Sequence, residues 1–219
     1  FLPGIAAGEL HFSIGYSEPN AGTDLAALST TATVDPDDAD YYRINGTKVF
    51  TSGAEGADYI WLAARTTPDS RHKGVTMFVV DASDPGFSIA PIHTVGGVRT
   101  NMSYYENVRV HKSMMIGEEN KGWGLIMAQL NHERVGLAAW GIQGWKLYDR
   151  TLAWARTEGK NGVRPIDEPR IQELLAEVLC VLEAQRVMNA RMAWDLDKGN
   201  MNPALASALK VYSTEGMVQ

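Results

Sequence analysis

The stretch Ile14–Asp24 reads IGYSEPNAGTD and cannot form one regular strand or helix. The proline that follows Glu18 excludes the α region at Glu18 and imposes an extended or turn geometry there. Asn20 and Gly22 tolerate positive φ, so the backbone can turn tightly with its N–H groups directed outward. Such a loop suits an anionic or carbonyl-bearing ligand, although most clusters of glycine, proline and asparagine are only turns.

Composition and charge exclude several classes of protein. The chain has 219 residues, of which 45% are hydrophobic and 21% charged, as is typical of a globular protein. Its net charge of −6 and its lack of a basic run argue against nucleic acid or an anionic membrane as a partner. No apolar run approaches the roughly 18–20 residues that span a bilayer. The five histidines lack metal-ligand spacing, so no metal site is predicted.

Cys180 is the single cysteine, which rules out an internal disulfide and fits the reducing cytoplasm. Because it lies in an apolar helical pattern, we expect it in a helix core rather than acting as a nucleophile. The first ten residues, FLPGIAAGEL, contain neither a basic region ahead of the apolar residues nor an initiator methionine. We therefore expect a cytoplasmic protein, of which this chain is an internal piece.

The predicted fold is α+β, with a central antiparallel β-sandwich or barrel followed by a truncated up-and-down helical bundle. Residues 1–12 are expected to end a helical domain, residues 13–117 to form the β-domain, and residues 118–219 to form part of the bundle. Asn45-Gly46, between two strand-like runs, predicts a hairpin turn. Further short strands are expected at Tyr59–Arg65, Val75–Asp81, Phe87–Pro91 and Ser103–Val110.

The helical part has its own pattern. Apolar residues recur at helical spacing from Trp123 to about Thr157, which predicts one long helix. A second helix is expected from Pro169, where a missing N–H costs nothing, to about Gly199, and a third from about Ala204. Their apolar faces are too broad to cover one another, so we expect further chain or a partner subunit to complete the bundle.

Glu133 is the candidate catalytic residue, in the segment LNHER. It shares one helical face with Leu137 and Trp140, at positions i, i+4 and i+7. A carboxylate against an apolar aromatic surface suits a general base near neutral pH, but the spacing taken alone favours an exposed helical glutamate. A similar choice, between contact with a planar ligand and core packing, holds for the aromatic residues Phe50, Tyr59 and Trp61.

Several separate motifs together resemble the flavin-dependent acyl-CoA dehydrogenase family. YSEPNAGTDL (Tyr16–Leu25) resembles the family's TEP-x-A-G-S-D flavin loop, and INGTKVFTSGAEGADYIWLAART (Ile44–Thr66) resembles its NG-x-K-x-W-I-T-N segment. ENVRV (Glu106–Val110) and IGEENKGW (Ile116–Trp123) follow at the junction between β-domain and helices. With LNHERVGLA included, the chain looks most like actinobacterial members that oxidise steroid side-chain CoA thioesters.

The resemblance implies an enzyme that binds FAD between the β-domain and the helices. The residues expected to bind the cofactor are Tyr16, Ser17, Gly22, Thr23, Phe50, Thr51 and Ser52. Phe50 replaces the family's tryptophan that covers the flavin ring, so it can stack but cannot donate an indole N–H. Thr23 and Arg134 are expected to contact the substrate, with Arg134 acting as a packing or electrostatic neighbour of Glu133.

The reaction implied is the α,β-dehydrogenation of an acyl-CoA thioester to a trans-2-enoyl-CoA. A base removes the α-proton while the β-hydride passes to flavin N5. Most of the family places this base near the C-terminal end, and a minority places it on the first long helix after the β-domain, in an L-x-x-E-R setting. Glu133 occupies the second position and is the predicted base. An electron-transfer flavoprotein is the expected acceptor, and a homo- or heterotetramer the expected assembly.

Two alternatives fit the same motifs. Nothing in these residues sets reactivity with oxygen, so an acyl-CoA oxidase also fits. Heteromeric members of the family pair a competent chain with one that supports FAD but lacks the base, so a non-catalytic subunit fits as well. The identity of the acyl group, whether fatty, branched or steroid, is left open by these residues, as is a competing glutamate further along the chain.

Overall fold

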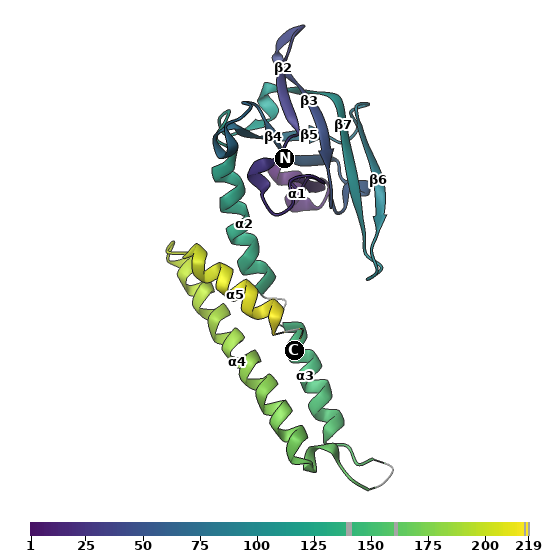
Figure 1. The fold of residues 1–219 in the computed structure, drawn as a ribbon, viewed down its shortest axis with the longest axis vertical. Coiled ribbons are helices and arrows are strands. Elements are labelled where there is room, and N and C mark those ends of the chain that lie inside the picture. Colours follow the sequence, from purple (N-terminus) through teal and green to yellow (C-terminus); the bar gives the residue numbers. More distant parts are fainter. Residues whose placement is uncertain (139–141, 160–161, 217, 219) are drawn as a thin grey trace. The chain divides into compact units, whose positions relative to one another are not determined.

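The computed structural model describes residues 1–138, 142–159, 162–216 and 218, in two compact units, Phe1–Ile126 and Met127–Gln219 (Figure 1). The first unit holds the β-sheet and the second is helical, which confirms the predicted order of fold classes. The strands are β1 (Phe12–Gly15), β2 (Thr31–Asp35), β3 (Asp38–Lys48), β4 (Tyr59–Arg65), β5 (Val75–Asp81), β6 (Phe87–His93), β7 (Arg99–His111) and β8 (Met115–Ile116). The helices are α1 (Leu2–Ala7), α2 (Gly122–Ala138), α3 (Ile142–Ala155), α4 (Pro169–Asp197) and α5 (Pro203–Glu215), with short 3-10 turns that include η1 (Leu25–Ala27), η2 (Ala54–Gly56) and η3 (Arg71–Gly74).

The sheet of the first unit has eight strands in the order β6-β7-β3-β2-β4-β5-β8, and β1 pairs with β4 off this path. Most neighbouring strands are antiparallel, as predicted, but β1 and β2 each pair with β4 in parallel. The β2–β4 register contains a single residue pair, Thr31 with Arg65. The sheet therefore consists of two halves that meet at this pair.

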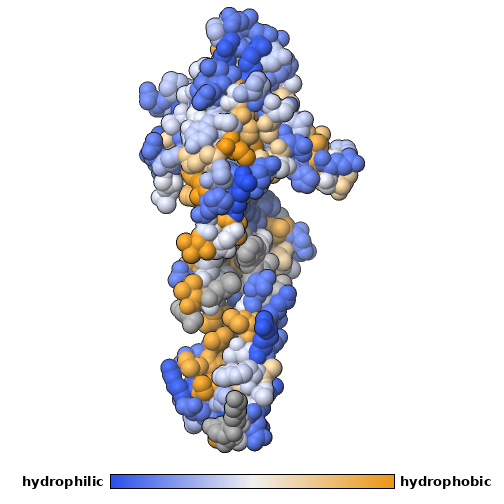
Figure 2. Space-filling view, turned by 90° about the vertical axis from the view of Figure 1, so that its right-hand side faces the viewer, coloured by the Kyte–Doolittle hydropathy of each residue, from blue (hydrophilic) through white to orange (hydrophobic). Residues whose placement is uncertain are grey.

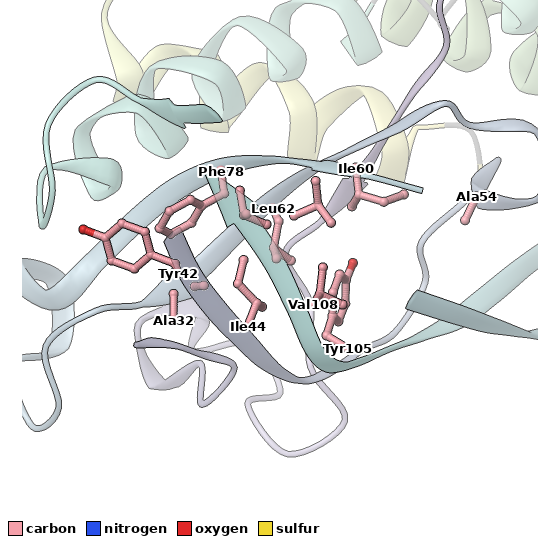
Figure 3. Packing of buried hydrophobic residues seen from close by; sticks show 12 residues of the cluster. Ala32, Tyr42, Ile44, Ala54, Ile60, Leu62, Phe78, Tyr105 and Val108 are labelled. Carbon is pink, nitrogen blue, oxygen red and sulfur yellow. The ribbon is translucent and has the colours of Figure 1, made fainter. Parts of the chain in front are cut away.

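The hydrophobic core draws side chains from both halves (Figure 3). Ile60 of β4 and Phe78 of β5 come from one half. Ile44 of β3 and Val108 of β7 come from the other, and all four side chains are fully buried. Each burial of this kind stabilises the fold by roughly 1.5–3 kcal/mol relative to exposure. Strand β5 buries six consecutive residues, Val75–Val80, which explains why its sequence is apolar apart from Thr76 rather than alternating.

Strands β4 and β5 begin and end at the predicted residues, whereas β6 and β7 extend beyond the predicted ones. The predicted hairpin turn at Asn45-Gly46 is wrong, because β3 continues through these residues, with a shift of its register to β7 between Ile44 and Gly46. The turn lies instead at Pro36-Asp37, between β3 and the unpredicted strand β2. Asn45 makes a side-chain pair with Asn107 of β7: its Nδ2 donates to Asn107 Oδ1 at 3.2 Å and its Oδ1 accepts from Asn107 N at 2.8 Å.

The predicted long helix from Trp123 to about Thr157 is described as two helices, α2 and α3, and residues 139–141 between them lie outside the described residues. The helix α4 begins at Pro169, as predicted. The helix α5 is capped by Asn202, whose Oδ1 accepts from Ala204 N at 2.9 Å. The core that joins α4 and α5 contains Met192, Ala206 and Leu209.

The apolar stripe of α4 is only partly covered, and apolar surface remains exposed on the helical unit (Figure 2). The exposed apolar side chains of α3 and α4 are Leu147, Trp154, Leu174, Val178, Val187 and Trp194. Cys180 is also exposed, so the prediction of a buried cysteine is wrong. It lies five residues after the buried Leu175, which at about 100° per residue places it on a different side of the helix. None of the described helices is long and apolar enough to cross a membrane.

Gly46 is needed for a close approach and not for a turn. A Cβ at this position would lie 2.7 Å from the Cα of Thr30, at a φ of 154°. We expect Gly46→Ala to lower the free energy of unfolding by about 2–4 kcal/mol, because backbone atoms must shift and the conformation disfavours a side chain. Urea unfolding followed by circular dichroism measures this change. Gly56→Ala is the matched control, since nothing lies within 4 Å of its Cβ position. Equal effects of the two substitutions would contradict the prediction.

Candidate functional site

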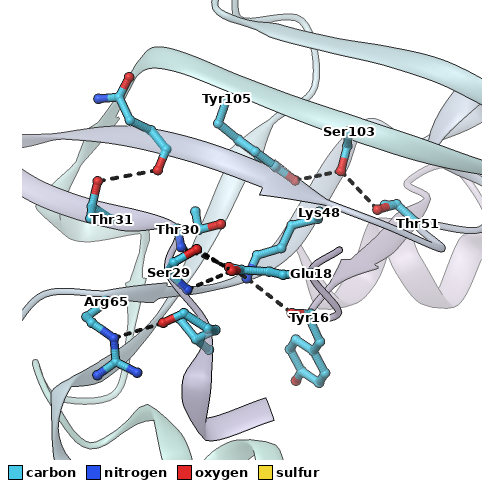
Figure 4. A network of polar contacts seen from close by, with 12 residues as sticks. Tyr16, Glu18, Ser29, Thr30, Thr31, Lys48, Thr51, Arg65, Ser103 and Tyr105 are labelled. Atoms are coloured by element: carbon cyan, nitrogen blue, oxygen red, sulfur yellow. Dashed lines mark hydrogen bonds and ion pairs between the residues drawn. The ribbon is translucent and has the colours of Figure 1, made fainter. Parts of the chain in front are cut away.

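The carboxylate of Glu18 organises the loop that contains it (Figure 4). Its Oε2 accepts hydrogen bonds from Ser29 N at 2.6 Å and from Ser29 Oγ at 2.7 Å, and its Oε1 accepts from Thr30 N at 2.9 Å. The loop is thereby closed onto the start of β2. The side chain of Glu18 is only 3% exposed. Burial alone would raise the pKa of Glu18, but Lys48 and these hydrogen bonds outweigh burial and hold it at about 2.

Lys48 is the counter-charge of Glu18 and is fully buried. Its Nζ donates to Glu18 Oε1 at 2.8 Å and to the carbonyl oxygen of Tyr16 at 3.1 Å. Burial lowers the pKa of Lys48 to about 8, against the opposing effect of Glu18. The pairing of Glu18 with Lys48 was not predicted from the sequence. The two-residue period of β3 contained the signal, because Lys48 follows the buried residues Tyr42 and Ile44 on the same side of the strand.

The structure brings two of the predicted cofactor segments together. Val49 N donates to Ser17 O at 2.9 Å, directly beside the contact between Lys48 and Tyr16. Ser13 Oγ donates to Ser52 O at 2.9 Å. The end of β3 and the chain after β1 therefore run side by side, although more than thirty residues separate them in sequence.

Phe50 lies two residues after the end of β3 and has a strained backbone conformation. Its φ is 59°, in the left-handed region that bulky residues avoid, and Ser52 N donates back to Phe50 O at 2.9 Å. The side chain is 64% exposed. An exposed aromatic ring in a costly backbone conformation is a feature that clusters at binding sites.

Thr51 and Ser52 differ in what they offer a ligand. Thr51 is fully buried, and its Oγ1 hydrogen bonds with Ser103 Oγ at 2.9 Å. Its backbone N donates to Asn101 O at 3.0 Å, and its backbone O accepts from Asn101 Nδ2 at 3.0 Å. Thr51 therefore holds the turn in place. Ser52 is exposed, with its Oγ in a hydrogen bond with Thr100 Oγ1 at 3.0 Å.

Gly22 and Thr23 form the exposed tip of the loop. Asp24 N donates to Ala21 O at 3.0 Å and closes the turn. Gly22 has a φ of 55°, and no atom lies within 4 Å of the position of a Cβ, so its backbone is open to an approaching ligand. Asp24 Oδ2 lies 2.8 Å from Arg71 Nη2, which links the loop to η3.

Arg65 clamps the segments that follow this loop. Its guanidinium donates to three carbonyl oxygens: Nε to Leu28 O at 2.9 Å, Nη2 to Ala26 O at 2.8 Å, and Nη1 to Arg71 O at 3.0 Å. A planar fork of five N–H donors suits such a set of acceptors better than an ammonium does. Arg65 thus joins η1 to η3 beside the loop.

The other two aromatic residues that the sequence offered for contact with a planar ligand, Tyr59 and Trp61, pack within the protein. Tyr59 stacks on Phe12 across β1 and β4, with ring centroids 5.3 Å apart, so it is a cross-strand pair. Trp61 Nε1 donates to the hydroxyl of the buried Tyr16 at 2.9 Å. Tyr16 is therefore held at both ends: Trp61 binds its side-chain hydroxyl, and Lys48 binds its backbone carbonyl oxygen.

Glu133 and Arg134 lie on α2, in the helical unit. Glu133 is exposed, and Arg134 is half-buried with Nη1 donating to Asn131 Oδ1 at 2.8 Å. Of the apolar face predicted beside Glu133, Trp140 and the side chain of Leu137 lie outside the described residues. Within the described part of the chain, no group of three or more His, Cys, Asp or Glu residues could hold a metal ion.

Comparison with known families assigns both halves of the chain. Residues 13–108 match the acyl-CoA dehydrogenase middle domain, and residues 120–219 match the acyl-CoA dehydrogenase C-terminal domain. The chain belongs to the acyl-CoA dehydrogenase family.

Individual relatives refine this assignment. The chain is 49% identical over 217 residues to the acyl-CoA dehydrogenase FadE29 of Mycobacterium tuberculosis, covering 98% of this chain and 54% of FadE29. Among solved structures, it is similar to the Tcur3481-Tcur3483 steroid ACAD G363A variant, with a TM-score of 0.91, 46% identity, and coverage of 100% of this chain and 56% of the other. The ChsE4-ChsE5 complex from Mycobacterium tuberculosis gives a TM-score of 0.89 at 45% identity, covering 98% and 55%. The chain thus spans about half the length of these relatives.

The strain at Phe50 can be measured by comparing two substitutions that both remove the ring. Asn tolerates the left-handed region and Leu does not, so we expect Phe50→Asn to be more stable than Phe50→Leu by about 1 kcal/mol. Urea unfolding of the two variants measures the difference. Because the native ring is largely exposed, little burial is lost in either variant. A Leu variant as stable as the Asn variant would show that the backbone at this position carries no strain.

Proposed function

We propose that the protein carrying this chain binds FAD and catalyses the α,β-dehydrogenation of an acyl-CoA thioester, in the cytoplasm. The observation that supports this most directly is the pairing of the Tyr16–Ser17 segment with Lys48 and Val49, directly before the exposed Phe50, in a chain of this family. Tyr16 and Ser17 would form one wall of the cofactor site and Phe50 the other. A site lined by one aromatic face and several polar groups suits a planar ligand whose edges form hydrogen bonds.

The described residues fit FAD on three counts. The Phe50 ring is exposed and available for stacking. Ser17, Thr23 and Ser52 are exposed residues that carry hydroxyl groups. Gly22 leaves its backbone accessible to close approach. Thr51 contributes by holding the turn, since its own polar groups bond within the chain. When bound, FAD would supply the acceptor for the two electrons that leave the acyl chain.

Glu133 is the proposed base, whose carboxylate oxygen accepts the α-proton. The α C–H of a thioester is a weak acid, so hydrogen-bond donors must stabilise the negative charge that develops on the thioester oxygen. The hydroxyl of Thr23, exposed at the loop tip, is the proposed donor from this chain. Arg134 is proposed as a cation near the substrate. Exclusion of water from around the substrate would strengthen these interactions.

We further propose a CoA thioester of a steroid side chain as the substrate and a heteromeric assembly as the active form. The support comes from relatives: two similar solved structures are named as a steroid ACAD and as a two-component complex. An electron-transfer flavoprotein is the proposed acceptor. Assaying hydrogen peroxide against reduction of that acceptor distinguishes a dehydrogenase from an oxidase.

Glu133→Gln tests the proposed base in the full chain with its partner subunit. We expect the variant to retain FAD and to slow substrate-driven loss of the flavin's visible absorbance by about 10²–10⁴-fold, the usual contribution of a general base. Stopped-flow mixing without oxygen measures this rate. Glu177→Gln, at an exposed position of α4, is the matched control and should react like the unmodified protein. Unchanged flavin reduction in Glu133→Gln would assign the base elsewhere and favour a non-catalytic role for this chain.

A further inference from the structure

Lys48 links the two segments proposed to bind the cofactor, Tyr16–Ser17 and Phe50, and the proposed function gives it no role. It is the last residue of β3, two positions before Phe50, and its Nζ reaches across to the carbonyl oxygen of Tyr16 (Figure 4). The backbone contact from Val49 N to Ser17 O lies next to it. Two adjacent hydrogen bonds therefore join the two segments, one through the backbone and one through the ammonium group.

We infer that Lys48 is a positioning residue for the cofactor, whose ammonium group, oriented by Glu18, sets the separation of the Tyr16–Ser17 segment from Phe50. This inference rests on the proposed function, because it takes FAD as the ligand between those segments. The backbone hydrogen bond from Val49 N to Ser17 O alone would fix one point of the Tyr16–Ser17 segment and leave the segment free to rotate about that point. The second contact, to the neighbouring carbonyl, fixes the orientation of the segment as well.

Glu18 is suited to orient Lys48 because its own position does not depend on Lys48. Three hydrogen bonds from Ser29 and Thr30 hold the carboxylate against the start of β2. The charged groups that act on the ammonium are Glu18, from the loop, and Arg65, from β4, which repels it. Tyr105 of β7 is buried, which raises the pKa of its hydroxyl, so it remains neutral. The ammonium group of Lys48 is thus a buried cation that forms an ion pair with Glu18 and donates a hydrogen bond to the carbonyl oxygen of Tyr16.

A purely structural ion pair would have different consequences. Replacing both members of a buried pair with neutral residues often leaves stability unchanged, whereas removing one member leaves a buried charge unpaired. We expect the double variant Glu18→Gln/Lys48→Met to keep the fold, because it removes both charges. The amide oxygen of the introduced glutamine, in the place of Oε2, can still accept from Ser29 N and Ser29 Oγ, while Thr30 N loses its acceptor. The double variant cannot restore the donor to Tyr16 O. Stability and cofactor affinity are separated in this variant.

The experiment measures FAD affinity of the apoprotein of the full chain, by quenching of flavin fluorescence, alongside thermal unfolding. We expect the double variant to unfold near the temperature of the unmodified protein and to bind FAD about 10–100-fold more weakly, the loss expected for one hydrogen bond from a charged group. Lys112→Met is the matched control, because Lys112 is an exposed lysine paired with Asp40. It should bind FAD like the unmodified protein.

The pH dependence supplies a second measurement that does not require a variant to fold. The pKa of Lys48 is about 8 in the folded chain and near 10.5 in the unfolded one, so the unfolded chain binds more protons between these values. The free energy of unfolding then rises with pH above about 8 through this group. FAD affinity should fall over the same range, as the ammonium loses its proton. The double variant should show neither trend.

The outcomes separate the inference from the proposed function. If the unmodified protein does not bind FAD, the proposed function fails, and this inference fails with it. If the unmodified protein binds FAD, two results would overturn the inference alone. One is a folded double variant with unchanged FAD affinity. The other is an FAD affinity of the unmodified protein that stays constant, or rises together with stability, from pH 7 to pH 9.

Discussion

Arg65 is the residue on which the arrangement of the first unit depends. Its backbone N donates to Thr30 O at 2.7 Å, beside the residue pair that holds β2 and β4 in register, so it joins the two halves of the sheet. Its side chain then holds the carbonyl oxygens of η1 and η3. Tyr16 follows β1, which pairs with β4, whereas Phe50 follows β3 in the other half. The proposed cofactor site thus spans the junction that Arg65 closes.

Buried charge gives this junction its specificity. The buried Glu18 and Lys48 and the half-buried Arg65 come from three segments, and each has its polar atoms placed against defined partners. Such groups add less to stability than an apolar core does, because desolvation offsets most of their attraction. They do, however, penalise any arrangement in which a partner is missing, since an unpaired buried charge is costly. The core supplies most of the stability, and the charges select one geometry for the loop.

Sequence reasoning located the elements better than the contacts between them. Apolar runs defined β4 and β5 to the residue, and the proline at the start of α4 marked its beginning. Asn45-Gly46 failed because its local turn signal was overridden by distant partners, Asn107 and Thr30. Among the predicted site residues, Phe50 is exposed and Thr51 is buried, and the buried Lys48 was not predicted. A lysine is seldom fully buried, so the place of Lys48 in the strand period does not by itself predict burial.

The sequence by itself determined that a β-domain is followed by helices, the family, and the composition of the loop Ile14–Asp24. These follow from periodicity, turn chemistry and motifs, all of which act over a few neighbouring residues. Only the tertiary structure decided which polar residues enter the interior and which aromatic ring is presented. Whether Lys48 can be buried depends on a carboxylate thirty residues away, and the left-handed φ of Phe50 is tolerated because the contacts around it hold the turn. Both are properties of packing between segments, which no local pattern encodes.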